Sequence, residues 1–190
     1  MALPAVDSFV DGAAVARIGA LPFEALQRFT PADVYLAPED RICRTMLEML
    51  NTEGVVLEPA GALALDVLGD LGELSGKTVV AVCSGGNFDF ERLPEVKERA
   101  QRFQGVKKYF VLRMPQRPGA LRDFLDLLGP NDDIARFEYL KKSARNFGSV
   151  LIGIETSDPA NLITLMARLD RSGFAYRDIT NDGILSELLV

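Results

Sequence analysis

The pattern of apolar and polar residues changes near residue 100. Before that point, segments with apolar residues at helical spacing alternate with short continuous apolar runs, at 33–37, 55–57 and 78–82. The spaced segments predict helices over 22–29, 38–50 and 59–68. Continuous apolar runs between helices are typical of a parallel sheet covered on both faces. The first part of the chain therefore predicts an α/β domain with a parallel sheet.

Three strands make an unusually small sheet, because a typical sheet has about five or six. The segment Val6–Gly12 near the start of the chain has no preceding element to pack on. We therefore expect residues 1–104 to be the end of a larger domain.

The second part, after a charged helix predicted over 92–104, has a different order of elements. Strands are predicted at 106–114, 134–140, 149–156 and 176–180, and helices at 118–128 and 159–172. This βαββαβ order is that of the split β-α-β, or ferredoxin-like, sandwich, an α+β fold. Because both helices cover one face of the sheet, the other face needs a partner. We therefore expect residues 105–190 to form a second domain and a homo-oligomer through its sheet.

Composition and charge exclude several classes of protein. The 190 residues are 48% hydrophobic and 25% charged, and none is a histidine. The lack of histidine excludes Ser-His-Asp and Cys-His catalysis and most zinc sites, so we expect no metal. Residues 1–100 carry 8 basic and 16 acidic side chains, whereas residues 101–190 carry 13 and 11. Because acidic residues lie among the basic ones, no nucleic-acid-binding surface is predicted.

No segment predicts a membrane span or a signal peptide. The apolar runs are shorter than the roughly 18 residues that a span needs, and the N-terminus lacks a basic region followed by an apolar core. Cys43 and Cys83 both lie in apolar sequence, which predicts two buried thiols without a disulfide. These features favour a reducing compartment, the cytoplasm.

The most informative motif is the apolar run that ends in Ser84-Gly-Gly-Asn87. A strand that ends in this way places a hydroxyl and bare backbone at the carboxyl edge of a sheet, where α/β proteins bind ligands. It is not a nucleophile elbow, because Val82 replaces the required glycine and the chain has no histidine. It is not a dinucleotide loop either, since no G-x-G-x-x-G is present. Two interpretations of the motif remain open: a plain strand-to-helix turn, or a serine hydroxyl that contacts a planar heterocyclic ligand.

Three stretches in the first part resemble the end of the catalytic domain of the threonine ammonia-lyases, fold-type-II enzymes that use pyridoxal phosphate. They are Val10–Val15 (VDGAAV), Glu58–Ala62 (EPAGA) and Ser84–Asn87 (SGGN). The resemblance implies that Ser84 hydrogen-bonds the pyridine nitrogen of the cofactor, and that Gly85 and Asn87 shape the ring pocket.

By the same resemblance, Glu58 lies near the ring edge and Gly12 on the substrate side. An acidic residue before Pro59 also suits any helix N-terminus, so this second explanation of Glu58 stays open.

Two segments of that family have no counterpart in the sequence. The family's Schiff-base lysine lies in an S-x-K-x-R-G segment and its phosphate loop has four consecutive glycines, and neither pattern is present. We therefore expect no catalytic residue in this chain, and no threonine deamination by the chain alone.

The second part carries Arg117-Pro-Gly-Ala-Leu121 after its first strand. Gly119 would let the backbone approach a ligand, and the following helix start would offer amide donors to a carboxylate. A plain helix start is the alternative.

In its βαββαβ setting, and with Asn146-Phe-Gly-Ser further on, this part resembles the ACT-like regulatory domain of the same enzymes. The resemblance implies an amino-acid effector, isoleucine opposed by valine. The implied effector residues are Arg117, Pro118, Gly119, Ala120, Leu121 and Asn146.

Together these features predict the carboxyl-terminal part of a threonine ammonia-lyase, which makes 2-oxobutanoate and ammonia from threonine under isoleucine feedback. The alternative is a non-catalytic amino-acid-binding module in which the first part is only a packing platform. An incomplete polypeptide with no role of its own is the third interpretation.

Overall fold

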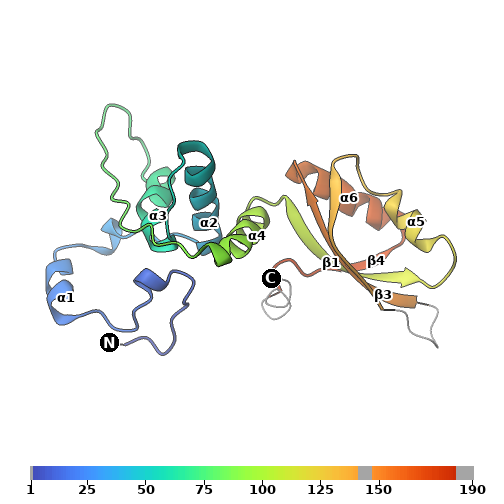
Figure 1. Ribbon diagram of the computed structural model, residues 1–190, viewed down its shortest axis with the longest axis horizontal. Helices are drawn as coiled ribbons and strands as arrows, with labels where there is room; N and C mark the ends of the chain where they lie inside the picture. The colour runs from blue at the N-terminus through green and yellow to red at the C-terminus, as the bar shows by residue number, and fades with distance from the viewer. Residues whose placement is uncertain (1, 141–146, 183–190) are drawn as a thin grey trace. The chain divides into compact units, whose positions relative to one another are not determined.

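The computed structural model describes residues 2–140 and 147–182. The chain divides into two compact units, Met1–Ala100 and Gln101–Val190 (Figure 1).

All regular secondary structure in the described residues of the first unit is helical. Its helices are α1 (Ala20–Leu26), α2 (Glu39–Glu48), α3 (Pro59–Asp66) and α4 (Leu93–Phe103), the last of which continues past Ala100. Glu39 and Asp40 lie in the first turn of α2, where negative charge is favourable. A π-helical turn over Met49–Glu53 extends α2, and it ends at Gly54, whose φ of +67° suits glycine.

The core of the first unit forms where α2, α3 and α4 present apolar side chains to one another. Its buried members include Ile42 and Met46 from α2, Ala62 from α3, and Val96 from α4. An ion pair between Arg41 of α2 and the buried Asp66 of α3 also connects these two helices.

The predicted parallel sheet is not observed, because none of residues 2–100 forms a strand. A strand exists only through a ladder of hydrogen bonds to a neighbour, and the runs at 33–37, 55–57 and 78–82 have no such ladder. The last run is instead exposed, with Val80 82% and Val82 69% accessible. These runs therefore form no strand among residues 2–100, and the parallel sheet stays a prediction.

The second unit is an α+β sandwich. Its elements are β1 (Lys107–Pro115), α5 (Ala120–Leu125), β2 (Asp132–Leu140), β3 (Phe147–Thr156), α6 (Pro159–Ser172) and β4 (Ala175–Asp178). The strands lie in the order β2-β3-β1-β4, and each neighbouring pair is antiparallel. The predicted βαββαβ order is confirmed among the described residues, although α5 is shorter than the predicted 118–128.

Both α5 and α6 pack against the same face of this sheet (Figure 1). Alternate residues of β1 and β3 point into that core, among them Phe110, Leu112, Ile152 and Ile154. Asp158 begins α6 by accepting a hydrogen bond from the Ala160 N–H at 2.9 Å. No helix among residues 2–140 and 147–182 is long and apolar enough to cross a membrane.

A polar link fastens β4 to β1. The Thr180 hydroxyl accepts from the Tyr109 N–H at 3.0 Å and donates to Asp178 at 2.6 Å, and Lys108 pairs with Asp178 at 2.7 Å. Burial disfavours the charged form of Asp178, but these hydrogen bonds outweigh burial and lower its pKa.

Candidate functional site

The loop Ser84–Asn87 of the first unit, called the serine loop below, is largely exposed but is held by a hydrogen bond. Ser84 and Asn87 are accessible, and Gly85 between them is half-buried. The Gly85 carbonyl accepts a hydrogen bond from the Glu58 N–H at 3.3 Å. The Ser84 hydroxyl is therefore presented from a loop that is held one residue later.

Three segments far apart in the sequence meet at this anchor. A Cβ at Gly85 would overlap the Glu58 carboxylate, and a Cβ at Gly61 would overlap the Gly85 carbonyl. A Cβ at Gly12 would lie 3.4 Å from Glu58 Oε1. The α3 backbone at Gly61 lies close enough to the Gly85 carbonyl to require glycine. Of the predicted cofactor residues, the structure brings Gly12, Glu58 and Gly85 together next to Ser84, whereas Asn87 is placed on the exposed end of the loop.

The segment that carries Gly12 is held by a contact that the sequence did not indicate. The Phe9 ring is 3% exposed and lies 4.2 Å from the Arg99 guanidinium and 5.0 Å from that of Arg92. Arg92 also donates to the Phe9 carbonyl at 3.3 Å. No local pattern signals this contact, because Phe9 and the two arginines lie at opposite ends of the unit's sequence.

This cluster is chemically suited to the ring of pyridoxal phosphate. Ser84 is exposed, so a flat group could approach its hydroxyl, whereas the open side of Gly85 is occupied by the Glu58 carboxylate. A hydroxyl leaves a pyridine nitrogen neutral, whereas a carboxylate would favour its protonation. The exposed Ser84 therefore suits the cofactor implied by the sequence resemblance, and the roles of Gly85, Asn87, Glu58 and Gly12 stay predictions.

The two thiols differ, contrary to the prediction that both are buried. Cys43 is buried in the core of the first unit, but Cys83 is exposed beside Ser84. Burial, partly opposed by Arg99, raises the pKa of Cys43 to about 12. Cys83 is exposed because the apolar run before it has no strand neighbours.

We expect a disulfide reagent such as DTNB to modify one thiol per folded chain, Cys83, at pH 8. Raising the pH to 9.5 should not release Cys43, because that pH is far below its folded pKa and only the thiolate reacts. The measurement is the number of thiols modified before and after denaturation, with Cys83→Ser as the control that should show none. Two reactive thiols in the folded chain would contradict this assignment.

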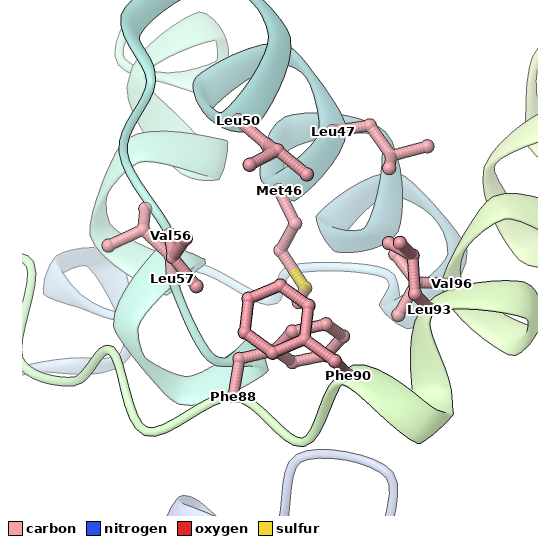
Figure 2. Close-up of a pocket in the computed structure, with 9 residues that line it drawn as sticks. All are labelled: Met46, Leu47, Leu50, Val56, Leu57, Phe88, Phe90, Leu93 and Val96. Carbon is pink, nitrogen blue, oxygen red and sulfur yellow. The ribbon is translucent and has the colours of Figure 1, made fainter.

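A small apolar hollow lies beside the same core (Figure 2). Met46 and Leu50 line it together with Phe88 and Phe90, whose rings meet edge to face at 5.5 Å. Its volume of about 10 Å³ holds no more than one water-sized group. With no polar side chain in its lining, it is a packing gap and offers no catalytic chemistry.

The predicted effector loop of the second unit surrounds the start of α5. Four of its residues are exposed: Arg117, Pro118, Gly119 and Leu121. Gly119 has a φ of +85°, which explains glycine there, and Ala120 is buried in the core. The Ala120 N–H already donates to the Arg117 carbonyl at 3.3 Å, so this amide is not free for a ligand. Asn146 lies outside the described residues.

A cavity of about 410 Å³ opens beside this loop. Among the predicted effector residues that the structure describes, only Arg117 lines it, and its lining residues Arg113, Asp123 and Phe147 were not predicted from the sequence. Arg113 and Phe147 lie on β1 and β3, and their contact depends on strand register. The one sequence feature that could have indicated this cavity is Arg113, a charged residue between the apolar Leu112 and Met114.

Comparison with known proteins covers nearly all of the chain. Residues 2–85 match the family of pyridoxal-phosphate dependent enzymes, and residues 98–189 match the C-terminal regulatory domain of threonine dehydratase. The "L-threonine dehydratase biosynthetic IlvA" of Halalkalibacterium halodurans is 48% identical over 99% of this chain. Those of Bacillus subtilis and Staphylococcus aureus are 46% and 45% identical.

The chain spans about half the length of these curated relatives, between 45% and 46%. The two family matches occur in the same order as the two units, and the stretches that resemble the cofactor site fall in the first match. The chain therefore belongs to the threonine dehydratase family and corresponds to its carboxyl-terminal part.

Proposed function

We propose that this chain works within a pyridoxal-phosphate-dependent threonine dehydratase, which converts L-threonine to 2-oxobutanoate and ammonia. The observation that carries this proposal is the meeting of Gly12, Glu58 and Gly85 beside Ser84. Residues 1–104 would belong to the catalytic domain and residues 105–190 to the regulatory domain.

In the complete enzyme the bound cofactor would supply an electron sink for the bond changes at the substrate. The Ser84 hydroxyl would hold its pyridine nitrogen neutral, which moderates the sink and suits loss of the β-hydroxyl over transamination. Gly85 and Asn87 would border the ring, Glu58 would lie at its edge, and Gly12 would face the substrate.

The exposed runs of the first unit would complete a parallel sheet with strands of the amino-terminal part. The exposure of Val80 and Val82 supports this, because apolar strands of parallel sheets are covered on both faces. The exposed, unpaired Cys83 supports a reducing compartment such as the cytoplasm.

The second unit would sense an amino acid, isoleucine opposed by valine, and the chain would self-associate through its sheet. Its cavity supports the first point, since about 410 Å³ lies within the usual range for small-molecule sites. The helix-free face of the sheet supports the second. Amino-acid binding without catalysis is the alternative for this polypeptide by itself, because the described lining residues of the cavity all belong to the second unit.

The proposal can be tested by joining this chain to the amino-terminal part of the Bacillus subtilis relative. With pyridoxal phosphate the joined protein should form 2-oxobutanoate from threonine, and Ser84→Ala should lower kcat by about tenfold or more. Ser75→Ala, at another exposed serine of the first unit, should not. A folded, cofactor-loaded protein that forms no product would contradict the proposed activity.

A further inference from the structure

The cavity of the second unit has walls of opposite charge. Arg113 and Arg117 line it together with Asp123, and Phe147 and Phe174 supply apolar surface. A site with a cation, an anion and aromatic walls matches a zwitterion that also carries an apolar group.

The two arginines are not equivalent. Arg117 forms an ion pair with Asp123 and donates to the Pro118 carbonyl at 3.3 Å, so its charge is already compensated. The Arg113 guanidinium lies 4.1 Å from the centre of the Phe147 ring. Among residues 2–140 and 147–182, no carboxylate forms a salt bridge with it.

The surroundings of Arg113 keep it available. Its cross-strand neighbours are Ser149 on β3 and Ala175 on β4, both small and uncharged. Stacking on Phe147 uses the flat face of the guanidinium and leaves N–H groups at its edge to donate. Two such N–H groups match the two oxygens of a carboxylate.

We propose that Arg113 binds the α-carboxylate of the amino-acid effector. Asp123 pairs with Arg117 through Oδ2, and its other oxygen, Oδ1, accepts from the ammonium group of the effector, whose aliphatic side chain contacts Phe147 and Phe174. This assignment rests on the proposed sensing function of the second unit. It places the charged anchor on β1, outside the Arg117–Leu121 loop.

The test is calorimetric titration of the 190-residue chain with isoleucine. We expect Arg113→Gln to weaken isoleucine binding by about 10- to 100-fold, as for loss of a hydrogen bond to a charged group. Arg177→Gln, which removes the same charge from the neighbouring strand, should change the affinity less than about twofold. Arg177 is the matched control because it pairs with Asp182 and is not in the cavity lining.

A ligand without the carboxylate, 2-methylbutylamine, completes the test. It should bind the parent chain much more weakly than isoleucine does, and it should bind Arg113→Gln and the parent equally.

An Arg113→Gln affinity for isoleucine within about twofold of the parent would overturn the assignment and leave the sensing function intact. No heat from isoleucine with the folded parent would overturn the sensing function and this assignment with it. If Arg113→Gln does not fold, the comparison of ligands on the parent decides, since equal binding of isoleucine and the amine would overturn the assignment.

Discussion

Gly61→Ala is expected to destabilise the first unit by about 3 kcal/mol or more. The added Cβ would overlap the Gly85 carbonyl oxygen and lie 2.9 Å from its carbon, so backbone must move. Helix propensity alone predicts the opposite sign, because alanine is better than glycine inside a helix by roughly 0.5–1 kcal/mol. A loss of stability in Gly61→Ala would therefore indicate that the serine loop packs closely against α3. A gain would indicate that helix propensity alone decides the result.

The measurement is the rate of Cys43 modification in a Cys83→Ser background, since a buried thiol reacts only when the unit opens. Gly69→Ala is the matched control, because a Cβ at Gly69 meets nothing within 4 Å. Gly85→Ala should cost less than Gly61→Ala, since its clash is with the flexible Glu58 side chain. Equal protection of Cys43 in the Gly61→Ala and Gly69→Ala chains would show that α3 and the serine loop are not packed as described.

Asp66→Ala should cost about 3 kcal/mol of stability in the same unit. The Asp66 side chain is fully buried, accepts from Arg41 Nε at 2.8 Å and accepts from the Thr45 hydroxyl at 2.8 Å. Its removal would leave both donors without this partner and would remove the polar contact between α2 and α3. Arg41 keeps its bond to Asp70, which places the cost at the lower end of the range for broken buried pairs.

Urea unfolding followed by Cys43 modification measures this change. Asp70→Ala is the control, because the Asp70 side chain is 36% exposed and surface ion pairs contribute at most about 1 kcal/mol. Similar losses of unfolding free energy in Asp66→Ala and Asp70→Ala would mean that the buried Arg41–Asp66 pair stabilises the unit no more than the exposed Arg41–Asp70 pair does.

The elements that the sequence predicts well are those decided by their own residues. Leu162, Leu165 and Leu169 mark one face of α6 by spacing alone, and Gly173 ends that helix with a φ of +76°. The strands of the second unit also follow from local pattern, because their neighbours lie within the same 90 residues. This is why the βαββαβ order was predictable.

The failures share a physical cause, which is dependence on distant segments. The run before Ser84 has strand composition, yet its ladder requires neighbours that residues 2–100 do not supply. Cys83 is exposed for the same reason. The contact of Phe9 with Arg99, and that of Arg113 with Phe147, depend on which segments meet in the fold. Neither contact leaves a periodic signal in the sequence.

The stretches that meet beside Ser84 could be singled out from the sequence because they are short and contain unusual glycines. The stretches that contain Gly12, Glu58 and Ser84 can be recognised one by one, but their proximity is a property of the fold. Of the charged residues that line the cavity of the second unit, only Arg117 was predicted from the sequence. Arg113 lies on β1 and Asp123 on α5, and the predicted loop includes neither residue.

We propose that this chain joins a cofactor-binding loop to an effector-sensing unit. The most direct test uses this chain joined to the amino-terminal part of the Bacillus subtilis relative and measures the rate of 2-oxobutanoate formation from threonine as isoleucine is added. We predict that isoleucine lowers the rate and that valine restores it. A rate that stays constant up to saturating isoleucine, in a protein that is active and folded, would contradict the account.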